Sequence, residues 1–375
     1  MRRPPIPIDA ACCARAASGD EIWRYSHKMR GVLPRAPSNR GVAVAYGRVF
    51  EATDDNRVIA LDQATGKVVW DKVTLPYDPS ALVPQGEQKP DVQFVMRAAP
   101  LVYDGKVIVG ATGFEANRFD DDFVKTSIAA GIDVGTAWIN ANLGRRGFLS
   151  ALDAQTGTEI WRWYTTKEDG WEGDYVATAP DGTPLHRDIA AEKAAAQIYK
   201  NAWASGSNST WMTPAFDPAL GLIFIGIGNP APGDVDLVRP GDNLYANGVA
   251  ALDAKTGVLR WFFQESPHGQ YDATGQAVLL DAKIGDRTVP AVLECGKAGW
   301  CFVIDRASGK FLNFSSVPTK WCRTRIHILR RTRHPQPSRL RPDRAVLSLS
   351  RRFPTTRFPA PSTWRRGMTH PSRHS

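Results

Sequence analysis

The stretch Ala251-Leu-Asp-Ala-Lys-Thr-Gly-Val-Leu-Arg-Trp261 decides the fold, because the same frame of eleven residues occurs three times in the chain. The frame reads A-L-D-x-x-T-G-x-x-x-W and returns at residues 60–70 and 151–161. Shortened copies stand at residues 18–23 and 303–309, which brings the number of copies to five. An internal repeat of this kind indicates that the chain uses one supersecondary unit several times.

Each copy has the pattern of a β-hairpin. An apolar run reaches an Asp, a polar turn closes on a Gly, and a second strand ends in a Trp. The glycine can take a positive φ angle where the chain reverses, and the Asp side chain can accept hydrogen bonds from the turn amides. One such hairpin cannot bury its Trp alone, so the frame requires a similar neighbour.

The spacing of the copies predicts a β-propeller. Consecutive turn glycines are separated by 47, 91, 100 and 52 residues, counted along Gly19, Gly66, Gly157, Gly257 and Gly309. The short intervals suit one four-stranded blade each, and the long intervals suit a blade with an inserted loop. We therefore expect an all-β, incomplete propeller of about four to five blades. Three indoles should lie buried between adjacent blades, those of Trp70, Trp161 and Trp261.

The positive charge of the chain is concentrated at its C-terminal end. The segment 321–375 contains 14 Arg, no Lys, no Glu and one Asp, whereas the whole chain carries a net charge of only +9. This segment is rich in Pro, Ser and His and has no copy of the frame, so we expect a tail that is disordered or translated out of frame. A nucleic-acid-binding arm would contain Lys and interleaved aromatic residues, and we expect no nucleic-acid partner.

The first seventeen residues also depart from the repeat. They are rich in Arg and Pro and contain vicinal Cys12-Cys13, and no apolar run in them is long enough for a signal peptide. We accordingly divide the chain into a doubtful N-terminal segment 1–17, a partial propeller 18–320 and the tail 321–375. The five cysteines form no C-x-x-C pair, so their spacing indicates neither a metal site nor the redox compartment.

Between the strand-forming runs, two long segments interrupt the repeat. Residues 114–146 and 165–209 separate strand patterns, and the second contains a helix candidate at 189–200. Strands are expected to resume at 211–216 and 222–226, and again at 291–293 and 301–304. Such long insertions are typical of surface loops over one face of a propeller, and binding sites on propellers gather in such loops.

Several ordered motifs in these loops carry a resemblance to a known family. They are Ser38-Asn-Arg-Gly-Val-Ala-Val44, Ala99-Pro-Leu-Val-Tyr-Asp-Gly-Lys-Val-Ile-Val-Gly-Ala-Thr-Gly-Phe-Glu115, Thr210-Trp211, Gly226-Ile-Gly-Asn-Pro-Ala-Pro232, Ser266-Pro-His-Gly-Gln-Tyr-Asp272 and Lys297-Ala-Gly299. From Ser18 to Phe311 the chain resembles the quinoprotein dehydrogenases of the methanol/ethanol type. These use pyrroloquinoline quinone (PQQ) and Ca²⁺ on an eight-bladed propeller.

The resemblance implies a calcium site and a catalytic base. Glu115 and Asn229 would be calcium ligands, in keeping with the preference of Ca²⁺ for carboxylate and amide oxygens. Asp272 would be a further ligand and the catalytic base, because it stands in the family's P-H-x-x-[WY]-D pattern with Tyr271 as the aromatic residue. Thr274 occupies the position at which lanthanide-using relatives have an extra Asp, so the chain resembles the calcium type.

The same resemblance implies the residues that would hold the quinone. Trp211 would be the floor on which the flat cofactor stacks, and Thr112 and Gly113 would pack near its opposite face. Arg40 and Lys297 match cationic residues near the quinone oxygens and carboxylates, where positive charge stabilises an oxyanion. Without the resemblance, a Trp in a strand-rich protein is usually a core residue and a loop Arg or Lys an ordinary surface cation.

Two departures from the family pattern affect the expected pocket. The family often has a vicinal disulfide just before the N-R-G motif, where this chain has Pro34-Arg35. A Thr that contacts the cofactor in the family is replaced by Arg97. The second change would place a large cation near the quinone.

The function implied is the oxidation of a small alcohol to an aldehyde, with Asp272 accepting the hydroxyl proton and hydride passing to PQQ. Electrons would leave to a cytochrome c or a membrane quinone, and the family resemblance implies the periplasm. Two alternatives remain open, a PQQ-dependent sugar dehydrogenase and a non-catalytic propeller scaffold. The pattern also suggests a fragment of a larger enzyme.

Overall fold

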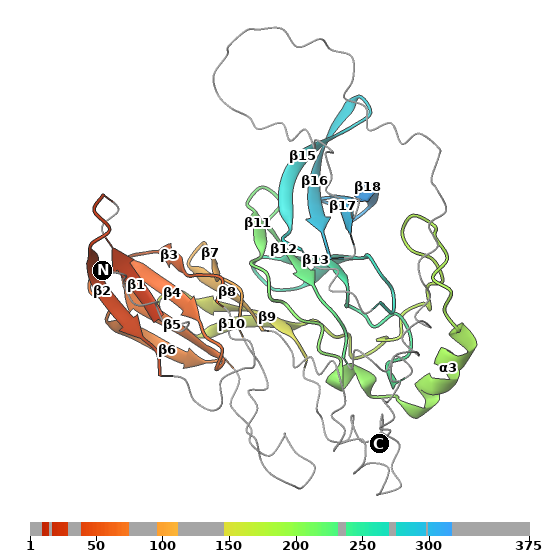
Figure 1. The fold of residues 1–375 in the computed structure, drawn as a ribbon, viewed down its shortest axis with the longest axis horizontal. Helices are drawn as coiled ribbons and strands as arrows, with labels where there is room; N and C mark the ends of the chain where they lie inside the picture. Colours follow the sequence, from red (N-terminus) through yellow and green to blue (C-terminus); the bar gives the residue numbers. More distant parts are fainter. Residues whose placement is uncertain are drawn as a thin grey trace, which may run out of the picture. The chain divides into compact units, whose positions relative to one another are not determined.

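The structure is a computed structural model that describes residues 10–14, 17–28, 39–74, 96–111, 146–231, 238–269, 275–297 and 299–316. The chain divides into two compact units, residues 1–323 and 324–375, and all described residues belong to the first. Figure 1 labels α3 and those strands for which there is room.

Four four-stranded antiparallel sheets follow one another along the described chain, each built from consecutive strands (Figure 1). Sheet I contains β3 (Ala43–Ala45), β4 (Arg48–Ala52), β5 (Arg57–Asp62) and β6 (Val68–Val73). Sheet II contains β7 (Leu101–Tyr103), β8 (Lys106–Ala111), β9 (Phe148–Asp153) and β10 (Glu159–Tyr164). Sheet III contains β11 (Ala215–Asp217), β12 (Leu222–Ile227), β13 (Gly248–Asp253) and β14 (Leu259–Gln264). Sheet IV contains β15 (Val278–Ile284), β16 (Arg287–Cys295), β17 (Trp300–Asp305) and β18 (Phe311–Ser316).

A smaller sheet precedes these four. It pairs β1 (Ala10–Ala14) with β2 (Glu21–Ser26), so part of the segment 1–17 is β-structure. The four blades and this pair confirm the expected all-β fold and its incomplete set of blades. The domain boundaries at residues 17 and 320 stay predictions.

The Asp and Thr of each frame build the turn between the third and fourth strands of a sheet. In sheet III, Asp253 accepts hydrogen bonds from the amides of Lys255 (3.0 Å) and Thr256 (3.0 Å) and from the Thr256 hydroxyl (2.9 Å). Asp62, Asp153 and Asp305 make the same three bonds in the other sheets. A bond from Arg260, together with these donors, lowers the pKa of Asp253 to about 2.

The Gly and Trp of the frame join one sheet to the next. A side-chain carbon on Gly157 would lie 2.8 Å from the Trp70 ring, and one on Gly309 would lie 2.7 Å from the Trp261 ring. Trp23 packs on Gly66 and Trp161 on Gly257 in the same way. The turn glycine of each copy therefore supplies the surface on which the Trp of the preceding copy packs. Trp70 and Trp161 are buried as expected, whereas Trp261 packs on the next sheet but is only half-buried.

The indole nitrogens also reach the next turn, with one exception. Trp70 Nε1 donates to the Ala154 carbonyl (3.1 Å), and Trp261 Nε1 donates to the Arg306 carbonyl (3.3 Å). At the equivalent carbonyl of Ala254 the donor is instead the hydroxyl of Tyr103. Trp161 Nε1 is left without a hydrogen-bond partner among the described residues.

The hydrophobic core consists of layers between successive sheets. Because side chains alternate along a strand, Val107 and Val109 of β8 face sheet I, whereas Ile108 faces sheet III. A third layer packs Phe224 of sheet III with Phe302 of sheet IV. These apolar layers hold each sheet against the next, and the packed sheets in turn position the loops at their ends.

Two local expectations are adjusted by the structure. The helix expected at 189–200 is α3 (Ile189–Ile198), where the Asp188 side chain caps the N-terminus by accepting from the Ala191 amide (3.0 Å). A short 3₁₀ helix follows at Ala202–Ser205. The strand expected from Trp211 begins only at Ala215, because Pro214 has no amide to donate to a neighbouring strand.

Candidate functional site

The sequence-predicted site residues that the structure describes belong to segments at one end of the sheets. Each sheet has tight turns from its first to second and third to fourth strands, and these turns lie at one end, here called the turn end. The connections from the second to the third strand, which are long only in sheets II and III, lie at the opposite end, as do the segments that lead into each first strand. We call this the loop end.

The structure describes four of the predicted site residues. Arg40 leads into β3, Trp211 leads into β11, Asn229 follows β12 and Lys297 follows β16, all at the loop end. The other four lie outside the described residues: Thr112, Gly113, Glu115 and Asp272.

The indole of Trp211 packs against the backbone of Gly228, with no room for a side chain between them. Its neighbour Thr210 is buried and donates its hydroxyl to the carbonyls of Ala111 and Phe148, each at 3.0 Å. These two carbonyls are the loop-end termini of β8 and β9. Trp211 is half-buried and is therefore fixed at the loop end with part of its ring accessible.

Asn229 lies directly beside this indole contact, since it follows Gly228. The Gly228 amide donates to the Ser209 carbonyl (2.9 Å), and the Asn208 amide donates to the Asn229 carbonyl (3.1 Å). The segments 208–211 and 228–229 are thus paired through their backbones. An aromatic surface and an amide side chain, 18 residues apart in sequence, are brought together.

The segments that lead into the first strands contact one another across the sheets. The Arg40 amide donates to the Arg97 carbonyl (3.1 Å), which links the approach to β3 with the approach to β7. The Thr213 hydroxyl donates to the Ala99 carbonyl (3.0 Å), which links the approaches to β7 and β11. A chain of contacts therefore connects Arg40 with the segment that contains Trp211.

The same chain continues to sheet IV. The Gln276 side-chain amide donates to the Thr213 carbonyl (2.5 Å), and the Gly275 amide donates to Oε1 of Glu294. Glu294 is three residues before Lys297. The four described candidates are therefore connected at one end of the sheets, although they derive from three of them.

Two arginines lie together in this chain of contacts. Partial burial, and then the charge of Arg97, lower the pKa of Arg40. Such a shift indicates that the two guanidinium groups are close enough to repel each other. Arg97 thus places a second cation beside Arg40 at the loop end.

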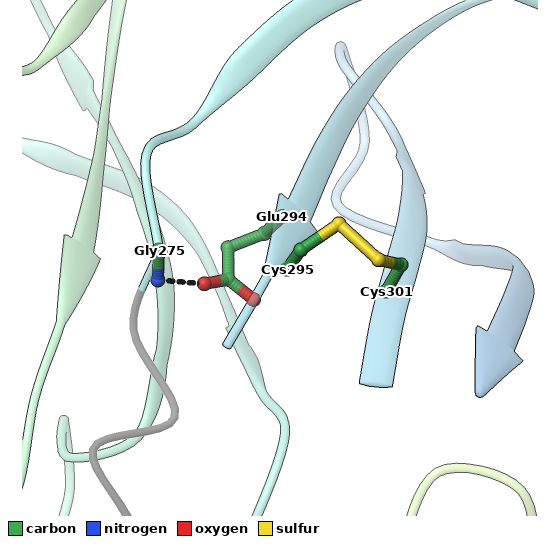
Figure 2. Close-up of a disulfide and its surroundings, with 4 residues drawn as sticks. All are labelled: Gly275, Glu294, Cys295 and Cys301. Carbon is green, nitrogen blue, oxygen red and sulfur yellow. Dashed lines mark hydrogen bonds between the residues drawn. A yellow bond between two sulfur atoms is a disulfide. The ribbon is translucent and has the colours of Figure 1, made fainter. Parts of the chain in front are cut away.

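Lys297 is carried by a turn between β16 and β17. The Gly299 amide donates to the Gly296 carbonyl (3.2 Å), and the Gly296 amide donates to the Trp300 carbonyl (3.1 Å). A disulfide between Cys295 and Cys301 closes the base of this turn (Figure 2). The sequence analysis missed this bond. Its signal was a pair of cysteines placed symmetrically about a Gly-containing turn, which pairs them across an antiparallel ladder.

His268, in the motif that precedes Asp272, is held by its backbone and its ring. Its amide donates to the Asp242 carbonyl (3.2 Å), its carbonyl accepts from Arg239 (3.2 Å), and its Nδ1 lies 2.7 Å from the Gly241 carbonyl. Burial, followed by the charge of Arg239, lowers the pKa of His268. The neutral ring with a proton on Nδ1 fits this contact.

A buried ion-pair network supports this region from the insertion 165–209. Arg187 pairs with Glu192 of α3 and with Asp242, both at 2.5 Å. Glu192 also accepts from the Gly241 amide (3.0 Å). Sequence reasoning had treated the insertion as a surface loop, and no local pattern distinguishes these buried charges from solvated ones.

Two buried carboxyls occupy the loop end of sheets III and IV. Glu265 follows β14, and Glu294 is near the end of β16. Burial and then Glu294 raise the pKa of Glu265 well above its ordinary value, and burial raises the pKa of Glu294 as well. One proton shared by the pair relieves the repulsion between them.

Metal binding is tested only in part by this arrangement. Within the described ranges there is no group of three or more His, Cys, Asp and Glu side chains able to hold a metal ion. Of the predicted calcium ligands, only Asn229 is among the described residues. Among these residues, too, no helix has the length and apolar character needed to cross a membrane.

A series of four-stranded antiparallel sheets joined by Trp-to-Gly packing, with loops gathered at one end, defines a protein of the β-propeller class. The family model of the glucose/ethanol/alcohol dehydrogenase β-propeller domain, named PQQ, matches residues 9–314. The chain belongs to this family.

Curated relatives and solved structures are consistent with this membership. A quinohemoprotein alcohol dehydrogenase, ADH IIB of Pseudomonas putida, is 33% identical over 80% of this chain and 37% of its own length. The quinoprotein alcohol dehydrogenase PedH of Pseudomonas putida is 28% identical over 79% of this chain and 43% of its own. The crystal structure of quinohemoprotein alcohol dehydrogenase from Comamonas testosteroni matches with a TM-score of 0.57 and 28% identity, covering 82% of this chain and 40% of that one. The chain thus spans less than half the length of these relatives.

Proposed function

We propose that the protein contributes the PQQ site of an enzyme that oxidises an alcohol to an aldehyde with the help of Ca²⁺. The observation that carries this proposal is the packing of Trp211 on Gly228 beside Asn229, connected through backbone contacts to Arg40. The names of the relatives favour an alcohol over a sugar as the substrate.

The described residues fit a flat, anionic cofactor. Gly228 lets the outer edge of the Trp211 ring contact the backbone, where a side chain would displace it, and a half-buried indole offers a face for stacking. Arg40 and Arg97 supply adjacent positive charge, and the exposed Lys297 adds a third cation at the loop end. PQQ has three carboxyl groups, so this charge complements it. Thr112 and Gly113 are proposed to pack near its other face.

Calcium would be held by oxygen ligands from separate loops. Asn229 offers an amide oxygen beside the stacking surface, and Glu115 and Asp272 are proposed as the carboxylate ligands. Bound there, the ion and the quinone would supply an electron-poor acceptor for two electrons and one hydrogen from the alcohol.

The protein's own part in the reaction is to bind, orient and deprotonate the alcohol. The Asp272 carboxylate is proposed to accept the hydroxyl proton as the hydrogen leaves the carbinol carbon with its electron pair, which yields the aldehyde. Arg40 and Lys297 would stabilise negative charge that develops on the cofactor oxygens. The ion-pair network around His268 would hold the start of the segment that leads to Asp272.

The electron acceptor and the compartment follow from the same proposal. We propose that a cytochrome c or a membrane quinone takes the electrons, since the names of relatives include quinohemoproteins and quinone-dependent dehydrogenases. We also propose that the enzyme works in the periplasm.

Two measurements on the purified chain test this function. Titration with PQQ in the presence of Ca²⁺, followed by tryptophan fluorescence, should show saturable binding that Trp211→Ala weakens at least tenfold, as expected for the loss of about 1–3 kcal/mol of stacking. Alcohol-dependent reduction of an artificial dye should require Asp272, so that Asp272→Asn turns over no alcohol even when Ca²⁺ and PQQ are supplied at saturating concentrations. Glu115→Gln should weaken Ca²⁺ binding, and PQQ binding with it, because it removes a charge from a ligand of a divalent ion.

The controls separate the enzyme from the scaffold alternative. Trp261→Phe changes an indole of the turn end and should leave PQQ affinity unchanged. A wild-type chain that is folded by circular dichroism and yet binds no PQQ with Ca²⁺ would contradict the proposal and favour a non-catalytic propeller. Unchanged turnover in Asp272→Asn would remove the assignment of the base.

A further inference from the structure

Glu294 combines complete burial with an incomplete set of partners. Its side chain is 0% exposed, and Oε1 accepts from the Gly275 amide. Apart from the neighbouring carboxyl of Glu265, the side chain has no other hydrogen-bond partner among the described residues. Burying a carboxyl lowers the stability of the fold. The residues that Glu294 contacts therefore indicate why it is present.

The contact with Gly275 is close on both sides. A side-chain carbon on Gly275 would collide with the Cys295 carbonyl and would lie 2.9 Å from Oε1 of Glu294. Only glycine fits where the approach to β15 crosses the end of β16. The next residue, Gln276, donates to the Thr213 carbonyl (2.5 Å), two residues after Trp211. Glu294 is thus the anchor that connects sheet IV with the segment of the stacking indole.

The residue after Glu294, Cys295, takes part in the disulfide that closes the Lys297 turn. Cys295 is bonded to Cys301, and the two cysteines are paired across β16 and β17 (Figure 2). Lys297 lies within the turn that this disulfide closes. Glu294 therefore contacts the approach to β15, and the adjacent Cys295 fixes the Lys297 turn.

We propose that Glu294 is a positioning residue for the cofactor site: by accepting the Gly275 amide beside the Cys295–Cys301 bridge, it sets the Lys297 turn relative to the segment that carries Trp211. This inference rests on the proposed function, because it assigns Lys297 and Trp211 to one anionic aromatic ligand. Loss of Glu294 displaces Lys297 relative to Trp211, while the Lys297 turn and the segment that carries Trp211 each stay folded.

Glu265 offers a matched control. It is a buried carboxyl of the same length, and its neighbour Glu294 is the charged group that acts on it. The hydrogen bond to Gly275 belongs to Glu294 alone in the described structure. Glu265→Gln therefore alters the same buried charge pair without removing the anchor.

The test compares Glu294→Met, Glu294→Gln and Glu265→Gln in the full chain by amide hydrogen exchange and by PQQ titration with Ca²⁺. In Glu294→Met we expect exchange at Gly275 to accelerate about tenfold or more, the effect of losing a charge-assisted hydrogen bond. PQQ affinity should fall by about tenfold. The melting temperature should stay the same or rise, because the substitution removes a buried carboxyl. Glu294→Gln keeps an acceptor oxygen and should restore both protection and affinity.

The outcomes distinguish this inference from the proposed function. If wild type binds PQQ and Glu294→Met binds it equally well, Glu294 has no positioning role. If Glu294→Met loses affinity only in proportion to a fall in melting temperature, or if Glu265→Gln has the same effect, the role is structural and the inference fails. If wild type binds no PQQ, the proposed function fails, whereas the exchange of Gly275 still reports whether Glu294 anchors it.

Discussion

The turn end and the loop end of the sheets differ in how far their contacts repeat from one sheet to the next. At the turn end, four copies of one frame make the same Asp-centred turn, and each Gly receives the Trp of the preceding copy. At the loop end of the described sheets, the side-chain contacts vary from sheet to sheet, and buried charges such as Arg187, Glu192 and Glu294 take the place of repeated apolar packing. Repetition thus supplies the scaffold, and the proposed site lies where the side chains depart from it.

The largest effect should come from a small change at the turn end. Gly157 has a φ angle of 71°, and an added methyl group would lie 2.8 Å from the Trp70 ring. Gly157→Ala should therefore lower the free energy of unfolding by about 2–4 kcal/mol, measured by chemical denaturation, since backbone strain and loss of the Trp contact combine.

Gly221→Ala separates these two causes. Gly221 has a similar φ angle of 64°, but nothing lies within 4 Å of the added carbon. Its cost should be only about 1 kcal/mol, from the backbone alone. Equal losses in the two variants would show that the Trp-to-Gly packing contributes nothing, and the contrast between the two ends would then lose its basis.

A smaller effect, and one on binding, should come from Arg97 at the loop end. Burial and then the charge of Arg97 lower the pKa of Arg40, so Arg97→Thr should move this pKa only part of the way back toward its ordinary value. PQQ affinity should fall by about three- to tenfold, and its dependence on salt should become shallower, because one charge no longer faces an anionic ligand. The melting temperature should hold or increase slightly. An affinity gain in Arg97→Thr would mean that Arg97 blocks the pocket.

The smallest effect concerns His268. Burial, and then the charge of Arg239, hold its pKa in the folded protein below the ordinary value of 6.5, so between the two values the unfolded chain binds more protons than the folded one. The contribution of His268 is complete above pH 6.5 and is lost as the pH falls toward the folded pKa. Melting temperatures between about pH 5 and 7 should therefore decline less in His268→Asn than in wild type. If the melting temperatures of the two proteins change with pH in parallel, the titration of His268 makes no net contribution to stability.

Much of the turn end could be predicted from sequence because its information is local. The Asp–Gly turn and the period of the frame are both visible in eleven residues, and Trp70 and Trp161 are buried as expected. The loop end was harder to predict from the sequence, because its contacts join residues that are far apart in the chain. The disulfide depended on the register of β16 and β17, and the pairing of Arg187 with Asp242 joins residues 55 apart. Family motifs located Arg40, Trp211, Asn229 and Lys297 at the loop end, and the roles of all the site residues stay predictions.

The Trp-to-Gly packing also bears on how freely such a protein can lengthen its loops. The indole bonds of Trp23 and Trp70 span 40 and 84 residues, respectively, because the second span includes a long insertion at the loop end. Doubling the length of a flexible loop adds only about 0.6 kcal/mol of closure entropy. This is about the contribution of one ordinary hydrogen bond. A blade can therefore acquire a segment dozens of residues long at one end while its join to the next blade survives at the other. New binding surfaces can in this way arise without the scaffold being rebuilt.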